Sequence, residues 1–235
     1  MNHPLIIAMD FKEKTEADTF LEKFAEEKLF LKIGMELFYR EGPDLIHTWK
    51  ESGHSIFLDL KLHDIPNTVK SAARQLAALD VDLTTVHAAG GMRMMEAALE
   101  GLDAGTPAGR AVPSCAAVTQ LTSTSESVMN KEIGIPGTLE ESVLHYARGA
   151  AEAGMQHVIS SAWEAGSIKQ QIPGMKAVTP GIRLTEDAAD DQNRVVTPAR
   201  AREYGSDAIV VGRSITLAEE PLPKYRTMMK QWRDH

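Results

Sequence analysis

Short apolar runs alternate with amphipathic runs from one end of the chain to the other. Most of the apolar runs are continuous, which is typical of parallel strands covered on both faces. Within the amphipathic runs, apolar residues recur at helical spacing, as Val69, Ala73 and Leu76 do. The pattern predicts eight strands with helices between them, the strands at residues 5–9, 30–35, 55–62, 83–88, 114–121, 156–162, 176–179 and 208–211.

Helix ends are marked by local signals. Thr138 and Glu141 have the spacing of a capping box ahead of an apolar helical face. Gly53, Gly154 and Gly205 stand where a helix should stop before the next strand. No linker rich in proline, glycine or serine divides the chain, so we expect one domain over residues 1–235.

Eight strand–helix units in 235 residues favour an α/β fold of the (β/α)8 TIM-barrel type. The main alternative is an open doubly wound sheet, which predicts a glycine-rich phosphate loop after the first strand. Here that strand runs into Met9, Asp10, Phe11 and Lys12, without such glycines. The sequence therefore favours the barrel.

A barrel carries its active site at the carboxyl ends of its strands. Polar residues collect at these predicted ends, and they do so on strands that lie far apart in the sequence. This concentration indicates a functional site at one mouth of the barrel. The residues are Asp10, Lys32, Asp59, Lys61, His87, Thr119, Gln120, Thr122, Arg183 and Arg213.

The third predicted strand and the residues after it carry Asp59, Lys61 and Asp64 among apolar neighbours, and Pro66 can open the next helix. On a regular strand Asp59 and Lys61 point to the same face. Because isolated buried charges are unfavourable, we expect these three to pair with one another and with Lys32 and Asp10 in an alternating chain.

Such a chain fixes the geometry of its side chains before a substrate arrives. Lys61 between carboxylates would stay protonated and act as a general acid toward a developing carbanion. The alternative is a network that serves stability alone.

Two glycine–arginine pairs follow the last two predicted strands. Loops at this place often bind phosphate through backbone N–H groups, and Arg183 and Arg213, each close to a glycine, add charged donors. The alternative is a pair of ordinary surface arginines. The polar segment 184–194 is long for such a loop, and it is either a lid over the phosphate or a solvated loop.

Composition narrows the class of protein. A net charge of −8 argues against a nucleic-acid binder that relies on a basic surface. The single cysteine, Cys115, excludes an intrachain disulfide and fits a reducing compartment. Neither a leader-like start nor a membrane-length apolar run occurs, so we expect a soluble cytoplasmic protein with no membrane partner.

Histidines raise the question of a metal. His63 and His87 with Asp59 resemble a metal site in composition, but Lys61 inside the cluster would repel a cation. We therefore expect no metal, and His87 as a wall residue. Cys115 and the three tryptophans are interpreted as packing residues, the tryptophans being Trp49, Trp163 and Trp232.

Taken together, several segments resemble the orotidine 5'-phosphate decarboxylase family, and the resemblance covers essentially the whole length of the chain. Met9 stands where leucine is usual. Ser160-Ser161 stands where a Cys-Ser pair is usual, which is not a catalytic position in the family. The segments that carry the resemblance are Ile7-Ala8-Met9-Asp10-Phe11, Leu31-Lys32-Ile33-Gly34, Asp59-x-Lys61-x-x-Asp64-Ile65-Pro66-Asn67-Thr68, Val118-Thr119-Gln120-Leu121-Thr122-Ser123, Pro180-Gly181-Ile182-Arg183, Asp191-Gln192 with Arg194, and Val211-Gly212-Arg213-Ser214-Ile215.

The resemblance implies a ribulose-phosphate-binding type of barrel that converts orotidine 5'-monophosphate to UMP and CO2 in pyrimidine biosynthesis, without cofactor or metal. It implies that Lys61 protonates C6, with Asp59 beside the departing carboxylate. It further implies a homodimer in which Asp64 and Thr68 come from the partner subunit. The substrate-binding residues implied are Asp10 and Lys32 at the ribose, Thr122 facing the base, Gln192 bridging base and phosphate, and Arg183, Gly212 and Arg213 at the phosphate, with Pro180 as a further substrate-binding residue.

Two other functions stay open on the residues alone. A magnesium-dependent sugar-phosphate decarboxylase or aldolase of the same superfamily shares the Asp-x-Lys-x-x-Asp pattern of Asp59, Lys61 and Asp64. A barrel that binds a nucleotide without turning it over is the second. Activity that a chelator does not affect would favour the cofactor-free decarboxylase over the magnesium-dependent enzyme. Turnover of the nucleotide would exclude the barrel that only binds it.

Overall fold

The computed structural model describes residues 3–24, 27–185, 187 and 195–234 and shows a closed barrel of eight parallel strands. Each strand pairs with its neighbours in sequence, and β1 pairs with β8 to close the ring. The (β/α)8 expectation and all eight predicted strands are confirmed, with ends that move by a few residues at most. The strands are β1 Leu5–Ala8, β2 Phe30–Gly34, β3 Ser55–Leu62, β4 Leu83–His87, β5 Ser114–Val118, β6 His157–Ile159, β7 Lys176–Thr179 and β8 Ala208–Val211.

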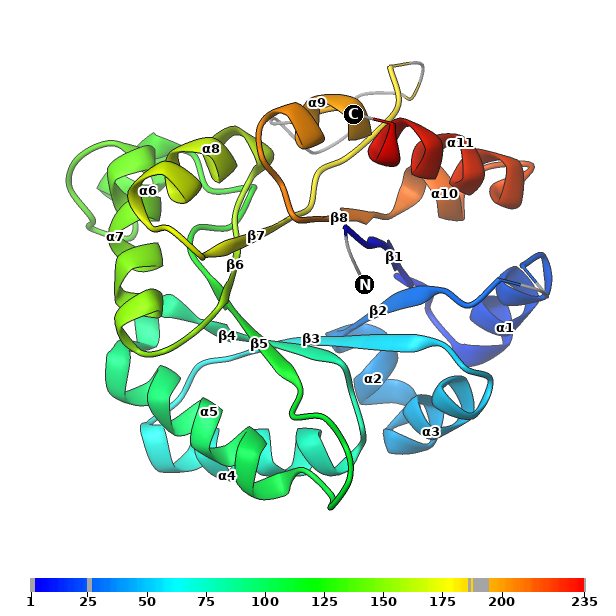
Figure 1. The fold of residues 1–235 in the computed structure, drawn as a ribbon, viewed down its shortest axis with the longest axis horizontal. Coiled ribbons are helices and arrows are strands. Elements are labelled where there is room, and N and C mark those ends of the chain that lie inside the picture. The colour runs from blue at the N-terminus through cyan, green and yellow to red at the C-terminus, as the bar shows by residue number, and fades with distance from the viewer. Residues whose placement is uncertain (1–2, 25–26, 186, 188–194, 235) are drawn as a thin grey trace.

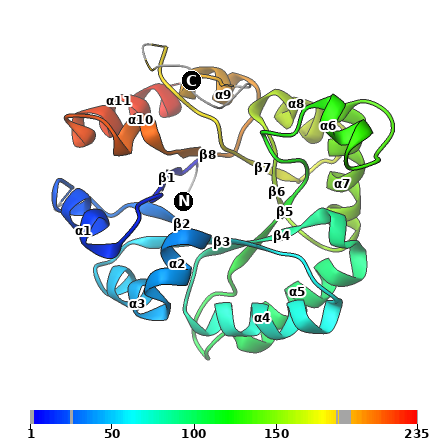
Figure 2. The same cartoon turned by 180° about the vertical axis from the view of Figure 1, so that it is seen from behind.

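Helices form the outer layer and surround the strands when the molecule is seen from either side (Figure 1, Figure 2). Within the described part of the chain, no helix is both long and apolar enough to cross a membrane. The helices are α1 Lys14–Glu22, α2 Met35–Glu41, α3 Pro43–Glu51, α4 Pro66–Ala78, the 3-10 turn η1 Ala88–Gly90, α5 Met92–Gly105, α6 Glu126–Lys131, α7 Leu139–Glu152, α8 Ala162–Gln171, α9 Pro198–Glu203, α10 Arg213–Thr216 and α11 Pro221–Arg233.

The core has two layers because successive strand residues point to opposite faces of the sheet. In β1, Ile6 and Ala8 join a cluster with residues of β3, β4, β5, β7 and β8, which fills the inside of the barrel. Leu5 and Ile7 of the same strand join a different cluster that includes helix residues such as Trp49. Continuous apolar strands are therefore buried on both faces, as their sequence pattern predicted.

The predicted helix boundaries are confirmed. Thr138 and Glu141 form a complete capping box at the start of α7. Gly53, Gly154 and Gly205 have φ angles of 84°, 87° and 93°, the left-handed conformation that glycine adopts without a steric penalty.

The amino-terminal end of the barrel contains a pair of matching polar connections. Asp82, just before β4, accepts hydrogen bonds at 2.7 and 2.8 Å from the N–H of Ile56 in β3 and from Lys50 in α3. Asp207, just before β8, accepts bonds of 2.9 Å from the N–H of the second residue of β7 and from Lys169 in α8. Both carboxylates are committed to holding adjacent units together, so this end serves stability, as is usual in barrels.

Among the residues interpreted as packing, one differs from expectation. Trp49, Trp232 and Cys115 are buried. Trp163 is 52% exposed, and its ring lies against that of Tyr204 with centroids 5.0 Å apart. Trp163 lies in the first turn of α8, and its ring packs on the residue that ends α9 instead of facing the barrel.

Candidate active site

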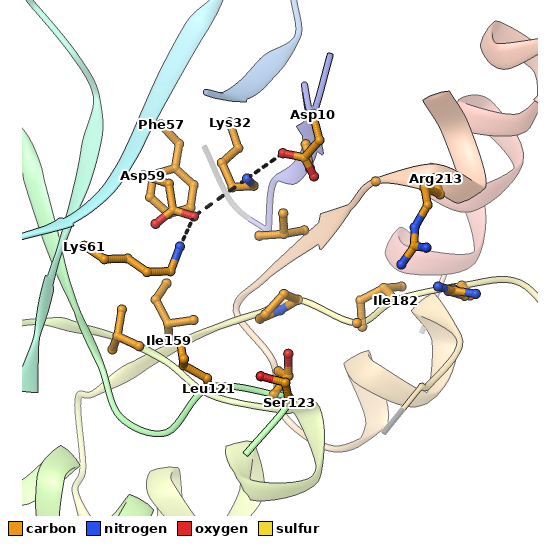
Figure 3. Close-up of a pocket in the computed structure, with 18 of the residues that line it drawn as sticks. Asp10, Lys32, Phe57, Asp59, Lys61, Leu121, Ser123, Ile159, Ile182 and Arg213 are labelled. Carbon is orange, nitrogen blue, oxygen red and sulfur yellow. Dashed lines mark hydrogen bonds and ion pairs between the residues drawn. The ribbon is translucent and has the colours of Figure 1, made fainter. Parts of the chain in front are cut away.

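A cavity of about 300 Å³ opens at the carboxyl ends of the strands (Figure 3). Residues at or just after almost every strand end line this cavity, so the polar residues that the sequence carries at those ends meet there. The lining includes, of the residues predicted from sequence, Asp10, Lys32, Asp59, Lys61, Thr122, Pro180, Arg183, Gly212 and Arg213.

Four charged side chains form a continuous chain along one wall of the cavity (Figure 3). Lys32 Nζ lies 3.1 Å from Asp10 Oδ1 and 3.7 Å from Asp59 Oδ2. Lys61 Nζ lies 2.8 Å from the same Asp59 oxygen. Asp59 has only 10% of its side chain exposed, so it is the most desolvated member, and it is the one that contacts two cations. The alternation predicted for these four residues is present.

The row of four paired charges prepares Lys61 for proton transfer at the cavity. An ammonium group carries three N–H bonds, and Lys61 directs one of them to Asp59. Lys61 lines the cavity, so its ammonium group is in a position to give a proton to a bound molecule. Charged partners already paired in the free protein need little rearrangement when a ligand enters.

Asp64 does not take part in this chain. Strand β3 ends at Leu62 and α4 begins at Pro66, so Asp64 lies in the connection between them. The Asp64 carboxylate is exposed and accepts a hydrogen bond of 2.6 Å from the N–H of Ile65. Thr68, in the first turn of α4, is exposed as well, and neither residue lines the cavity. The expectation that Asp64 joins the charge chain within one subunit is therefore wrong.

Asp59 and Lys61 do not meet along a regular strand. A regular strand was expected to point both side chains to one face, but Lys61 has a φ angle of +51° and the β3–β4 register shifts between Leu58 and Leu62. The pair meets through a β-bulge, an arrangement that re-aims side chains beside functional sites.

The other side of the cavity carries the arginines. Arg183 is 7% exposed, and its backbone N–H donates to Val196 O at 3.0 Å, which ties the loop after β7 to the segment before α9. Gly181 in the same loop has a φ angle of 82°. Arg213 follows Gly212 at the end of β8, and Figure 3 shows it across the cavity from Lys61. The cavity thus has a proton donor at one end and guanidinium groups at the other.

An apolar surface lies between these two ends. Its members come mainly from the carboxyl ends of strands and the loops that follow them, and sequence reasoning missed them because an apolar residue at a strand end looks like ordinary core. The lining also includes Gln120, which was expected at this strand end, and Ser123 of the same loop, for which no role was expected. The apolar lining residues are Ala8, Phe57, Val118, Leu121, Ile159, Ile182 and Val210.

The predicted lid can be described only at its start, because Gln192 and Arg194 lie outside the described residues. Asp187 accepts hydrogen bonds of 2.9 Å from the N–H of Leu184 and 2.8 Å from Lys224 of α11. Burial acts to raise the pKa of Asp187, but these hydrogen bonds outweigh it and the pKa is lowered. The segment after Arg183 is therefore anchored to α11 by a charged contact.

Two histidines near the cavity lie side by side. The ring centroids of His63 and His87 are 5.4 Å apart. Burial, together with the nearby charges of His63 and Lys61, lowers the pKa of His87. Across the described ranges, no group of three His, Cys, Asp or Glu side chains has the arrangement of a metal site.

Comparisons with known proteins give the same family over nearly the whole chain. The model of the orotidine 5'-phosphate decarboxylase / HUMPS family matches residues 3–228. A protein of Bacillus cereus (strain Q1) named orotidine 5'-phosphate decarboxylase is 58% identical over 233 residues, which is 99% of this chain and 98% of that protein.

Solved structures agree in fold. An uncharacterized conserved protein from Geobacillus kaustophilus is 51% identical with a TM-score of 0.88, over 97% of this chain and 100% of its own. The orotidine 5'-phosphate decarboxylase from Lactobacillus acidophilus is 42% identical with a TM-score of 0.89, over 99% of this chain and 100% of its own. The chain therefore belongs to the orotidine 5'-phosphate decarboxylase / HUMPS family.

Proposed function

We propose that this protein decarboxylates orotidine 5'-monophosphate to UMP and CO2, as a soluble cytoplasmic enzyme of pyrimidine nucleotide synthesis. One observation carries the proposal. A paired lysine–aspartate chain and two arginines lie at opposite ends of one cavity, with an apolar surface between them. A nucleotide has the matching chemistry, because its phosphate, ribose and planar base follow one another in the same order.

Binding starts from the phosphate end. Arg183 and Arg213 supply charged donors, and the backbone around Gly212 allows close approach. Gln192 lies outside the described residues, and its role as the bridge between phosphate and base rests on the family resemblance alone. Asp10 and Lys32 hold the ribose hydroxyl groups. Binding energy from the phosphate then contributes to holding the base at the reacting end of the cavity.

The reacting end contains the pyrimidine, flanked by Thr122, Pro180 and the apolar lining. The bond between C6 and the carboxylate breaks, CO2 leaves, and the electron pair stays on C6. Lys61 donates its proton to that carbon, and water later restores the ammonium group. Asp59 stands beside the carboxylate before it leaves, where the two negative charges repel each other in the bound substrate and not in the product.

The proposal is tested by mixing the purified protein with orotidine 5'-monophosphate and EDTA and following the ultraviolet absorbance of orotate. We expect rapid loss of the orotate band, and a decrease of at least about 10²-fold in rate for Lys61→Ala. Retention of the band by a folded wild-type protein would contradict the proposal. Turnover of a sugar phosphate that EDTA abolishes and magnesium restores, with no loss of the orotate band, would instead assign a metal-dependent sugar-phosphate chemistry.

We further propose a homodimer in which Asp64 and Thr68 complete the site of the partner subunit. Both residues are exposed and lie outside the cavity of their own chain. Ile65, next to Asp64, is 67% exposed, an unusual state for an isoleucine at the start of a helix. A second copy of the chain that covers this region would bury the isoleucine and bring Asp64 near a neighbouring lysine.

Subunit complementation tests this arrangement. Lys61→Ala and Asp64→Ala are each expected to be inactive alone. After the two variants are unfolded, mixed equally and refolded, half of the dimers are mixed, and one of the two sites in each mixed dimer contains both native residues. About a quarter of wild-type activity should return. Absence of recovery, with a dimer present by light scattering, would show that Asp64 acts within its own subunit.

A further inference from the structure

Strand β4 carries a residue that contacts the charge chain without lining the cavity. The β3–β4 register pairs Leu58 with Thr84 and Leu62 with Val86. Three residues of β3, from Asp59 to Lys61, therefore face a single residue of β4, which is Thr85. Regular ladder hydrogen bonds cannot be formed by all three, so the bulge needs another partner for its backbone.

The hydroxyl group of Thr85 supplies that partner. It accepts a hydrogen bond of 3.0 Å from the backbone N–H of Lys61 and donates one of 2.8 Å to Asp59 Oδ1. Thr85 is fully buried, so water does not compete for either bond. One hydroxyl group thus joins the backbone of the proton donor to the side chain of its carboxylate partner.

The two oxygens of the Asp59 carboxylate therefore have different partners. Oδ1 is held by Thr85, and Oδ2 contacts the ammonium groups of Lys61 and Lys32. Rotation of the carboxylate would break both sets of contacts at once. The left-handed backbone of Lys61, with its φ angle of +51°, is held by the same hydroxyl group.

We propose that Thr85 is a positioning residue that sets the geometry of the Asp59–Lys61 pair for proton transfer. It acts through these two residues because it is absent from the lining of the cavity. The role requires a group that donates and accepts at once on a short side chain, which among the amino acids restricts the position to threonine or serine. This inference adds a residue to the decarboxylation proposed above, and its kinetic experiment rests on that proposed activity.

The neighbouring Thr84 provides a matched control. It lies on the same strand, is 1% exposed, and donates a hydrogen bond of 2.9 Å to Leu58 O in β3. Thr84→Val therefore removes a hydroxyl group of similar burial that also bonds to β3, but not one that contacts Asp59 or Lys61. Thr85→Val keeps the shape of the side chain and removes only the two hydrogen bonds of interest.

The kinetic experiment measures kcat and KM for orotidine 5'-monophosphate in both variants. We expect Thr85→Val to lower kcat by about tenfold or more with a smaller change in KM, since misplacement of a reacting group by an ångström lowers rates by about 10²-fold. Thr84→Val should keep the kcat of the wild type. Equal kcat values for Thr85→Val and Thr84→Val would overturn the proposal.

A second pair of variants protects the experiment against misfolding. Thr85→Ser and Thr85→Ala both lose the methyl group and differ only in the hydroxyl group. We expect the serine variant to retain most of kcat and the alanine variant to lose it. If the two behave alike, the hydroxyl group has no positioning role.

Amide hydrogen exchange of Lys61, followed by NMR, tests the proposal without any substrate. The Lys61 N–H loses its acceptor in Thr85→Val, so its exchange should accelerate by about tenfold or more, while it stays unchanged in Thr84→Val. Unchanged exchange in Thr85→Val would overturn the proposal. If the wild type fails to decarboxylate the nucleotide, the proposed function fails, and this measurement still decides whether Thr85 holds the bulge.

Discussion

Lys61 and Asp59 contact each other across a bulged backbone. The ammonium nitrogen of Lys61 lies 2.8 Å from Asp59 Oδ2, although Lys61 has a φ angle of +51° and the strand is irregular at this point. A left-handed conformation is unfavourable for any residue with a Cβ atom. Strain at a position that also carries a charged, half-buried side chain is a common property of functional sites.

The strain at Lys61 can be measured with two substitutions. Lys61→Gly and Lys61→Ala both remove the ammonium group, and they differ in the Cβ atom that opposes a positive φ. We expect the glycine variant to be more stable than the alanine variant by about 1 kcal/mol in urea unfolding. Both should lack activity.

Lys32 is the control for this comparison because it lies in the extended strand β2 of the same charge chain. There Lys32→Gly should be less stable than Lys32→Ala by about 0.5–1 kcal/mol, the ordinary order for a strand. The same order of stability at both positions would argue that the backbone of Lys61 is not strained.

Arg213 is expected to act on the phosphate group alone. Loss of a charged hydrogen bond removes about 1.5–3 kcal/mol, so Arg213→Ala should lower kcat/KM for orotidine 5'-monophosphate by about 10- to 150-fold. The nucleoside orotidine lacks the phosphate, and its slow turnover should not change. Arg226, an exposed arginine paired with Glu27, provides the control substitution. An equal loss for nucleotide and nucleoside would place the effect of Arg213 elsewhere.

Helices α4 and α5 approach so closely that a glycine is required between them. A Cβ atom at Gly101 of α5 would lie 2.2 Å from the carbonyl oxygen of Lys70 in α4. Gly101→Ala should therefore destabilise the protein by about 3 kcal/mol, although alanine is the better helix former. Because α4 carries Thr68 and starts next to Asp64, the variant should also lose activity.

Gly149 of α7 is the matched control for that substitution. Among the described residues, no atom beyond the neighbouring residues and backbone of α7 itself lies within 4 Å of a Cβ atom built there. Gly149→Ala should stabilise the protein by about 0.5–1 kcal/mol, through helix propensity and a less flexible unfolded chain. Thermal or urea unfolding of the two variants gives both values. A stable Gly101→Ala variant would mean that α4 and α5 can separate at little cost.

Stability is expected to fall as the pH drops below about 6.5. Burial lowers the pKa of His54, His87 and His157 below the ordinary value of 6.5, so the native state binds fewer protons than the unfolded state in this range. The free energy of unfolding therefore decreases with falling pH, from the unfolded pKa down to the folded ones. His54 also accepts the N–H of Leu29 on Nδ1, a bond that protonation removes.

Urea unfolding at several pH values between about 8 and 5 measures this dependence. The lowered pKa of the carboxylate Asp187 affects stability only near and below its ordinary value of 3.8, outside that range. A variant with His54→Asn and His157→Gln should show a shallower slope than the wild type. An unchanged slope would assign the pH dependence to other groups.

Much of the fold and part of the site could be predicted from the sequence by itself. Strand positions follow from continuous apolar runs, and helix ends follow from local signals such as the capping box at Thr138. The barrel then brings together residues at strand ends, including Lys32, Asp59 and Arg213, because parallel strands end at the same mouth. These inferences succeed because each depends on a short stretch of chain and one rule of topology.

Other features were decided only by the tertiary structure. The bulge at Lys61, the two hydrogen bonds of Thr85 and the outward position of Asp64 depend on how β3 and β4 are paired and on where the chain turns after β3. Apolar residues that line the cavity, such as Ile159, have the same sequence pattern as core residues. Register and side-chain direction arise from contacts between segments distant in sequence, whose balance no local pattern records.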